Sequence, residues 1–176
     1  MSPTEMTQAQ AGLLETLQKR GHLTATNVRT IQAFVQRWHV PAHVAVLETC
    51  VLDEASLAEA IADCYAMPRL VQLRQIKVSR VNLERIPYAE ARRLEVLPVG
   101  PNSSNGRFGV VMADPTDPAR VAAVRDIIGE ELTLAVADRT DIVGTIDEFY
   151  PLSGRLPSIW ECDAPSGSSS ASRQNQ

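Results

Sequence analysis

The chain has 176 residues, of which 44% are hydrophobic and 5% are aromatic, and its formal net charge is −4. This length suits one domain, or a small domain with a helical appendage, and the acidic balance argues against nucleic-acid binding, which needs a basic face. No apolar run approaches the roughly 20 residues that span a bilayer, and the N-terminus lacks the basic and apolar regions of a signal peptide. We therefore expect a cytoplasmic protein that binds no nucleic acid and does not insert into a membrane.

Residues 7–37 predict two helices joined by a turn. The apolar positions at helical spacing are Leu13, Leu14, Leu17, Val28, Ile31, Phe34, Val35 and Trp38. Gly21 is suited to end the first helix, and Thr24 or Thr26 to cap the second. The pattern is therefore helix, turn, helix.

A second helix pair follows from Pro41. Asp53 is a good N-cap for the second helix of this pair, with Ser56 three residues later. The expected buried stripe of that helix is Leu57, Ala60, Ile61 and Cys64. Pro68 limits the helix, because the residue before a proline avoids the helical conformation. We therefore predict a helical subdomain over residues 1–68.

Residues 69–150 predict a small α/β subdomain. Residues 69–87 indicate a loop or short strand, and a short helix begins at Tyr88. Residues 96–100 and 107–113 indicate two strands, close enough along the chain to pair antiparallel. The fold class is therefore α+β: helical pairs followed by a short antiparallel or mixed sheet of about three strands with two or three helices.

An acidic turn occurs twice in this second subdomain. "VVMADPTDPARVAAV" is echoed 24 positions later by "TLAVADRTDIVGTI", and the four carboxylates concerned are Asp114, Asp117, Asp138 and Asp141. They are either working carboxylates for a metal or a proton, or caps at strand-to-helix corners. We favour structural caps, because Asp accepts from free amides of a first helical turn and Pro118 suits the first helical position.

The end of the chain has a different composition. We treat residues 151–176 as a tail that is disordered from about residue 165, where serine dominates and little apolar surface can be buried. Trp160 is an isolated aromatic in this tail, and it either docks on the domain or forms a short interaction motif.

Residue types that bind metals are few. The cysteines and histidines are Cys50, Cys64, Cys162, His22, His39 and His43. An odd number of well-separated cysteines favours reduced thiols over a disulfide or zinc site. His39 and His43 are four residues apart, but Pro41 between them prevents a shared helix face. We expect no metal site.

Motifs for catalysis are missing from the sequence. It has no phosphate-binding loop and no dinucleotide-binding glycine pattern. Neither Cys50 nor Cys64 stands in a glycine-rich elbow or near a local base. We therefore expect neither a catalytic residue nor a cofactor.

Taken in order, the sequence from "LPVG" through "RFGVVMADPTDPARVAAVRDIIGEELTLAVADRTDIVGTIDEFY" resembles the N-terminal domain of bacterial type II secretion and type IV pilus assembly ATPases, the MshEN-type domain. "VLDEASLAEAIADCYAMPRLVQL" is similar to the element that precedes it in that family. The resemblance covers residues 44–150, with a weaker helical match from Leu13. The family's ATPase module and its Walker motif do not occur in this sequence, so we expect a stand-alone domain or a split adaptor.

In some members this domain binds cyclic di-GMP through two motifs that begin Arg-Leu-Gly and end in Gln, which the resemblance places on the two helix pairs. The motif positions most relevant here are Gly12, Gly21, Pro41, His43, Cys50 and Cys64. The arginine that opens each motif is expected at positions 12 and 41, where this chain has Gly12 and Pro41. The second glycine of each motif is expected at positions 21 and 50, where this chain has Gly21 and Cys50. Arginine binds anions and glycine permits close backbone approach. We infer that cyclic di-GMP binding has been lost.

The resemblance implies a non-enzymatic interaction or regulatory domain. Its expected partner is a secretion or pilus ATPase, or a platform protein at the inner face of the cytoplasmic membrane. The alternative is a sensor of cyclic di-GMP or another nucleotide, for which the best remaining phosphate partners are Lys19, Arg20, Arg29 and Arg37. An unrecognised enzyme is a third possibility, and it would need a nucleophile and a base that meet in a cleft.

Overall fold

The computed structural model describes residues 8–101 and 106–150. The expectations for Trp160, Cys162 and the rest of residues 151–176 lie outside this range. In the described ranges, no helix is long and apolar enough to cross a membrane.

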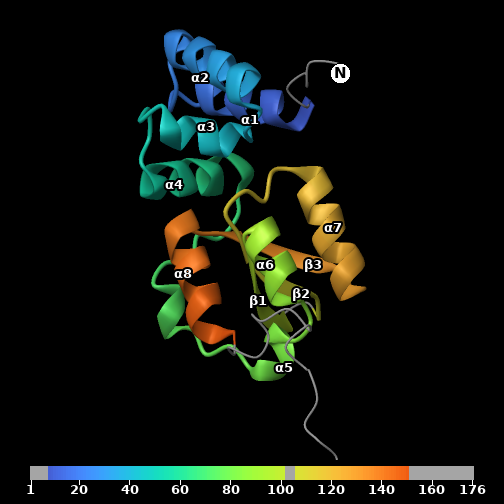
Figure 1. Cartoon of the computed structure of the whole chain (residues 1–176). Helices are drawn as coiled ribbons and strands as arrows, with labels where there is room; N and C mark the ends of the chain where they lie inside the picture. The colour runs from blue at the N-terminus through green and yellow to red at the C-terminus, as the bar shows by residue number, and fades with distance from the viewer. Residues whose placement is uncertain (1–7, 102–105, 151–176) are drawn as a thin grey trace, which may run out of the picture.

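Four helices form a unit at one end of the molecule (Figure 1). They are α1 (Gln8–Lys19), α2 (Ala25–Trp38), α3 (Ala42–Glu48) and α4 (Glu54–Tyr65). Their core includes Leu14, Ile31, Val46 and Ile61, each without exposed surface. The two predicted helix pairs are therefore present.

Caps fix where the second helix of each pair begins. Thr24 accepts from the amide of Asn27 at 3.1 Å, and the Asn27 side chain accepts from the Thr24 amide in return. Asp53 accepts from the Ser56 amide at 2.7 Å. One prediction is wrong: Trp38 was assigned to the apolar face, but it is 58% exposed, because it lies beyond Val35, the last buried residue of α2.

The α/β unit is built on a three-stranded sheet with strand order β1-β2-β3. The strands are β1 (Val96–Pro101), β2 (Phe108–Met112) and β3 (Leu132–Val136). β1 and β2 are antiparallel, with Leu97 opposite Val111, whereas β2 and β3 are parallel, with Val111 opposite Ala135. The sheet is therefore mixed, and the α+β fold class is confirmed.

Helices pack around this sheet (Figure 1). They are η1 (Leu73–Gln75), α5 (Arg80–Leu83), α6 (Tyr88–Leu94), α7 (Pro118–Ile128) and α8 (Arg139–Phe149). The expected loop or short strand at residues 69–87 thus contains two helical turns, η1 and α5. Ser79 starts α5 by accepting from the Asn82 amide at 3.2 Å, a local cap that the sequence analysis missed.

The two units meet at the end of β3. Val136 is fully buried and packs in the core of the helical unit, although it belongs to the sheet. The chain leaving α4 is bonded to the same residue: the Val136 amide donates to the Pro68 carbonyl at 3.0 Å, and the Leu70 amide donates to the Val136 carbonyl at 2.9 Å. The connection between the units is therefore part of the hydrogen-bonded structure.

Gly100 should be the glycine least tolerant of a side chain. Its φ is +123°, and a Cβ there would lie 2.1 Å from Asn82 Nδ2, which donates to the Val99 carbonyl at 2.8 Å. Gly129, at the end of α7, has φ +75° but open space around it. Gly129→Ala should lower the free energy of unfolding by about 1 kcal/mol, because it adds backbone strain alone. Gly100→Ala should lower it by about 2 kcal/mol more, because the new Cβ also clashes with Asn82. Urea unfolding measures both, and equal losses would contradict the prediction.

Candidate functional site at the joint of the helical and α/β units

The helix pairs repeat with a 29-residue offset that relates the motif positions to one another. Gly21 follows α1 with φ +84°, and Cys50 follows α3 with φ +52°. Each is three residues before the cap of the next helix, Thr24 or Asp53. The left-handed backbone that glycine favours is thus present at both turns, although Cys50 carries a side chain.

The other motif positions lie in or beside the helices. Gly12 is in α1, with nothing within 4 Å of where its Cβ would be. Pro41 is the N-cap residue of α3, and Cys64 is half-buried in α4. His43 is 1% exposed, and its counterpart in the first pair, Leu14, is also buried. The structure therefore brings only one of these positions, His43, into a cluster of ionisable groups.

Two carboxylates flank the His43 imidazole. Nε2 is 3.4 Å from Glu95 Oε2, and Nδ1 is 3.1 Å from Asp114 Oδ2, although this second contact is not aligned for a hydrogen bond. Glu95 is the C-cap residue of α6 with φ +51°, and Asp114 follows β2. His43 in α3 is therefore held at one end of the antiparallel strand pair, where β1 begins and β2 finishes.

Two arginines from other helices complete the cluster around Glu95. Arg139, the first residue of α8, donates from Nε to Glu95 Oε1, and Arg120 of α7 lies 3.5 Å from Glu95 Oε2. Glu95 is only 7% exposed. The carboxylate of Glu95 thus links α3, α7 and α8 to the start of β1.

Asp114 and Asp117 have different roles. Asp117 is the N-cap residue of α7 and accepts from the Ala119 amide at 2.9 Å, and Pro118 is the first helical residue. Asp114 is not a helix cap, which corrects the sequence interpretation. It accepts from the Thr116 amide at 3.0 Å and from the Thr116 hydroxyl at 2.6 Å, and its second oxygen faces His43, because it stands three residues before the helix begins.

Asp138 and Asp141 also depart from the expected caps. Asp138 occupies the N-cap position of α8, but its side chain makes no cap bond; it accepts from Arg69 at 3.0 Å. Asp141 accepts from the Leu73 amide at 2.9 Å, far away along the chain. The first turn of α8 is instead bound by Glu54 of α4, which accepts from the Thr140 amide at 2.8 Å. The repeated sequence therefore serves tertiary contacts at its second copy.

The charges of the cluster shift one another. Burial alone would lower the pKa of His43, but the carboxylates of Asp114 and Glu95 outweigh it and raise that pKa. Burial would raise the pKa of Glu95, but His43 and Arg139 lower it to about 2. The pKa of Asp114 is likewise lowered by His43 and Thr116 against the effect of burial. His43 is therefore favoured as an imidazolium between two carboxylates.

This cluster has little room for a ligand. The cavity beside His43 measures about 10 Å³, close to the space of a single water. Within residues 8–101 and 106–150, no group of three His, Cys, Asp or Glu side chains has the geometry to hold a metal. The arrangement is suited to joining elements and responding to protons.

Sequence reasoning missed Glu95, Arg120 and Arg139. Glu95 lies 52 residues from His43, and Arg139 is 44 residues from Glu95, so no local spacing relates them. The available signal was a single acidic residue in the apolar stretch "LEVLPV", directly before the strand expected at residues 96–100. A buried carboxylate in such a stretch requires cationic partners.

Cys50→Gly should stabilise the protein. Removing the side chain relieves the strain of the left-handed backbone at φ +52°. Glycine also increases the entropy of the unfolded chain, which offsets part of this gain, so the free energy of unfolding should rise by about 0.5 kcal/mol. Cys64→Gly, in the last turn of α4, should instead lower the free energy of unfolding by about 1 kcal/mol, because a half-buried side chain is lost and glycine has a low helix propensity. Urea unfolding under reducing conditions measures both, and a loss with Cys50→Gly would refute the strain.

His43→Gln should change the pH dependence of stability. The folded pKa of His43 is raised from 6.5, so its contribution is complete below pH 6.5 and is lost as the pH rises through the folded pKa. Because the folded pKa of Glu95 is lowered from 4.5 to about 2, its contribution is complete above pH 4.5 and is lost as the pH falls towards 2. The free energy of unfolding should therefore be highest between these limits.

His43→Gln should remove the decline above pH 6.5 and cost about 3 kcal/mol at pH 5.5, since it leaves Asp114 without its cation. His22→Gln, a matched change at an exposed site, should keep the decline. Urea unfolding from pH 4 to 9 measures both variants. A decline above pH 6.5 that persists in His43→Gln would show that another group causes it.

Comparison with known proteins gives one family and a small set of related structures. A family model, the MshEN domain, matches residues 65–156. This match covers Glu95, Asp114, Arg120 and Arg139, but not the helix pairs up to residue 64. The comparison with curated proteins found no match.

The solved structures extend the similarity beyond the α/β unit. The structure of MshE with cdg is 19% identical, with a TM-score of 0.64 over 78% of this chain and 98% of that chain. One crystal form of the N-terminal domain of XpsE is 24% identical, with a TM-score of 0.67 over 84% of this chain and all of that chain. A second crystal form is 26% identical with a TM-score of 0.53, over the same shares of the two chains.

The family model spans more than half of the chain, and the chain has the same fold as these solved structures. The resemblance found in the sequence is therefore confirmed. The chain belongs to the MshEN domain family and is an MshEN-like N-terminal domain of secretion ATPases.

Proposed function

We propose that this domain acts by protein–protein contact within type II secretion or type IV pilus machinery, without catalysis of its own. Its partner is a secretion or pilus ATPase, or a platform component at the inner face of the cytoplasmic membrane. The protein is then cytoplasmic, and the contact regulates or positions the partner.

The observation that carries this proposal is an aromatic patch at the end of α2. The Trp38 ring is 58% exposed, lies 6.2 Å from the ring of Phe34, and has the Arg37 guanidinium 5.5 Å from its centroid. Tryptophan and arginine are enriched among the residues that dominate binding energy at protein interfaces. A half-buried phenylalanine beside them supplies further apolar area for a partner.

The cluster at His43 supports the same reading. The resemblance places the first glycine of the second cyclic di-GMP motif at position 43, where this chain has a buried imidazole between Glu95 and Asp114. These carboxylates are already paired with His43, Arg120 and Arg139, and the cavity beside them, about 10 Å³, is too small for a dinucleotide. Position 43 serves the interior of the domain here.

Direct binding measurements test the proposal. The full chain is titrated against the purified ATPase and the cytoplasmic part of the platform protein of the corresponding machinery. Trp38→Ala should weaken binding about tenfold or more. Val81→Ala removes another exposed apolar side chain, from α5 in the other unit, and should leave affinity unchanged. Absence of saturable binding to either protein would refute the proposal.

A second candidate function is binding of cyclic di-GMP. The observation that favours it is the similarity to MshE in its structure with cdg, which covers 98% of that chain. The cations available on the helix pairs include Arg20 and Arg29, both exposed, whereas Lys19 is paired with Glu15 at 2.7 Å. Calorimetric titration with cyclic di-GMP separates the candidates. Saturable binding that Arg20→Ala or Arg29→Ala weakens, with none to cyclic di-AMP, would support the sensor.

A further inference from the structure

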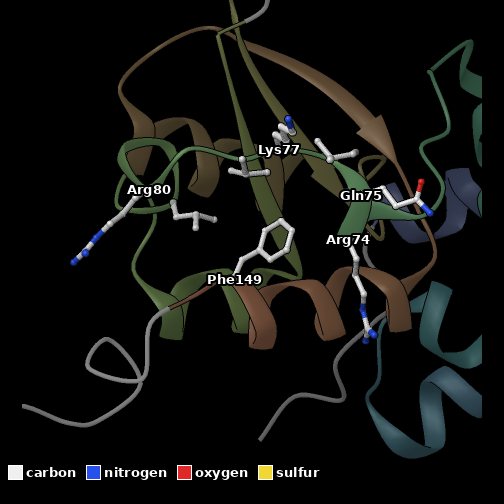
Figure 2. A pocket seen from close by; sticks show the side chains of 8 residues that line it. Arg74, Gln75, Lys77, Arg80 and Phe149 are labelled. Atoms are coloured by element: carbon white, nitrogen blue, oxygen red, sulfur yellow. The ribbon is translucent and has the colours of Figure 1, made fainter.

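A groove lies on the α/β unit, between the segment from η1 to α5 and the end of α8 (Figure 2). Its volume is about 630 Å³. The apolar side chains that line it are Ile76, Val78, Leu83 and Phe149. Figure 2 shows the Phe149 ring in the middle of the groove, rising from α8 towards the opposite segment. Half-buried apolar surface of this extent is suited to receive large apolar side chains.

Cations surround this apolar floor. Arg74, Lys77 and Arg80 are all exposed and line the groove, with Arg74 and Arg80 on opposite sides of it in Figure 2. Arg74 is 3.3 Å from Glu148, and Arg80 is 2.9 Å from Glu84. Within the described ranges Lys77 has no ion-pair partner. The groove therefore suits an occupant that combines apolar anchors with carboxylates.

The chain itself carries such a segment shortly after Phe149 in the sequence. Phe149 lines the groove, and the chain continues from Tyr150 into residues 151–176. Ile159 and Trp160 are the adjacent large apolar pair there, and Glu161 and Asp163 are the acidic residues that follow them. The nine residues between Tyr150 and Trp160 can span roughly 30 Å, which is ample to reach the groove.

We propose that this groove is the docking site of residues 156–163 of the same chain, "LPSIWECD". Ile159 and Trp160 cover the apolar floor, and the carboxylates of Glu161 and Asp163 lie near Lys77. A tether of this length gives an effective concentration of the order of millimolar, so a weak contact suffices to hold the segment. The proposal does not depend on the proposed function, since the groove is distinct from the aromatic patch on α2.

Trp160 provides the probe. The chain has two tryptophans, so Trp38→Phe leaves Trp160 as the single tryptophan, whose emission is excited selectively at wavelengths that tyrosine does not absorb. Acrylamide quenching of the full-length Trp38→Phe protein is compared with that of a synthetic peptide of residues 151–176. Docking predicts slower quenching and emission at shorter wavelength in the protein than in the peptide. Quenching equal to that of the peptide would overturn the proposal. The same result is expected if a separate protein, and not this segment, occupies the groove.

Variants in the same background locate the contact. Lys77→Glu should weaken docking about threefold, the effect expected of one exposed charge pair. Arg29→Glu makes the same change of charge on α2 and should have no effect. Val78→Asp places a charge on the floor and should expose Trp160 fully, with circular dichroism showing that the fold is retained. Protection that survives both Lys77→Glu and Val78→Asp would overturn the assignment to this groove.

Protein concentration separates docking within one chain from docking on a second copy. Protection of Trp160 that is constant over a hundredfold dilution supports the same chain as occupant. Protection that disappears on dilution would overturn the proposal in favour of exchange between copies.

Discussion

The buried carboxylate of Glu95 constrains the whole arrangement of the domain. A carboxylate that loses its water is tolerated only if cations and hydrogen bonds replace it, and here they come from His43 of α3, Arg120 of α7 and Arg139 of α8. Each partner stands on a different element, so all three helices must reach the same point at the start of β1. Apolar surfaces alone could pack against each other in several relative positions. This set of charged contacts instead defines one position of the helical unit relative to the α/β unit.

Much of the fold could be predicted from sequence because its signals are local. Helical spacing gave both helix pairs, Asp53 marked the start of α4, and Pro118 marked the start of α7. The turns at residues 73–83 were harder, since the segment is short and its cap, Ser79, acts over one turn only. Strand pairing followed from the short connection between the first two strands. The domain limits and the tail remain predictions.

The candidate site could not be predicted in the same way, because it depends on residues that fold together from distant parts of the chain. Asp114 and Asp117 stand in one turn and looked equivalent, yet one faces His43 and the other caps α7. Asp138 and Asp141 occupy the same positions in the second copy of this sequence pattern, but they bind Arg69 and the Leu73 amide. The partners of residues in the same local pattern are decided by tertiary contacts. The family resemblance indicated the motif positions, but not the role that His43 has in this chain.

The place of Val136 has a consequence for how the domain folds. This residue ends β3 but fills the core of the helical unit, and both its backbone groups are bonded to the chain that leaves α4. Opening the helical unit would uncover an apolar side chain of the sheet and break the ladder at its edge. Neither unit then has a complete interior without the other, so folding should be cooperative across the whole described chain, and separately expressed halves should aggregate or complement each other in solution.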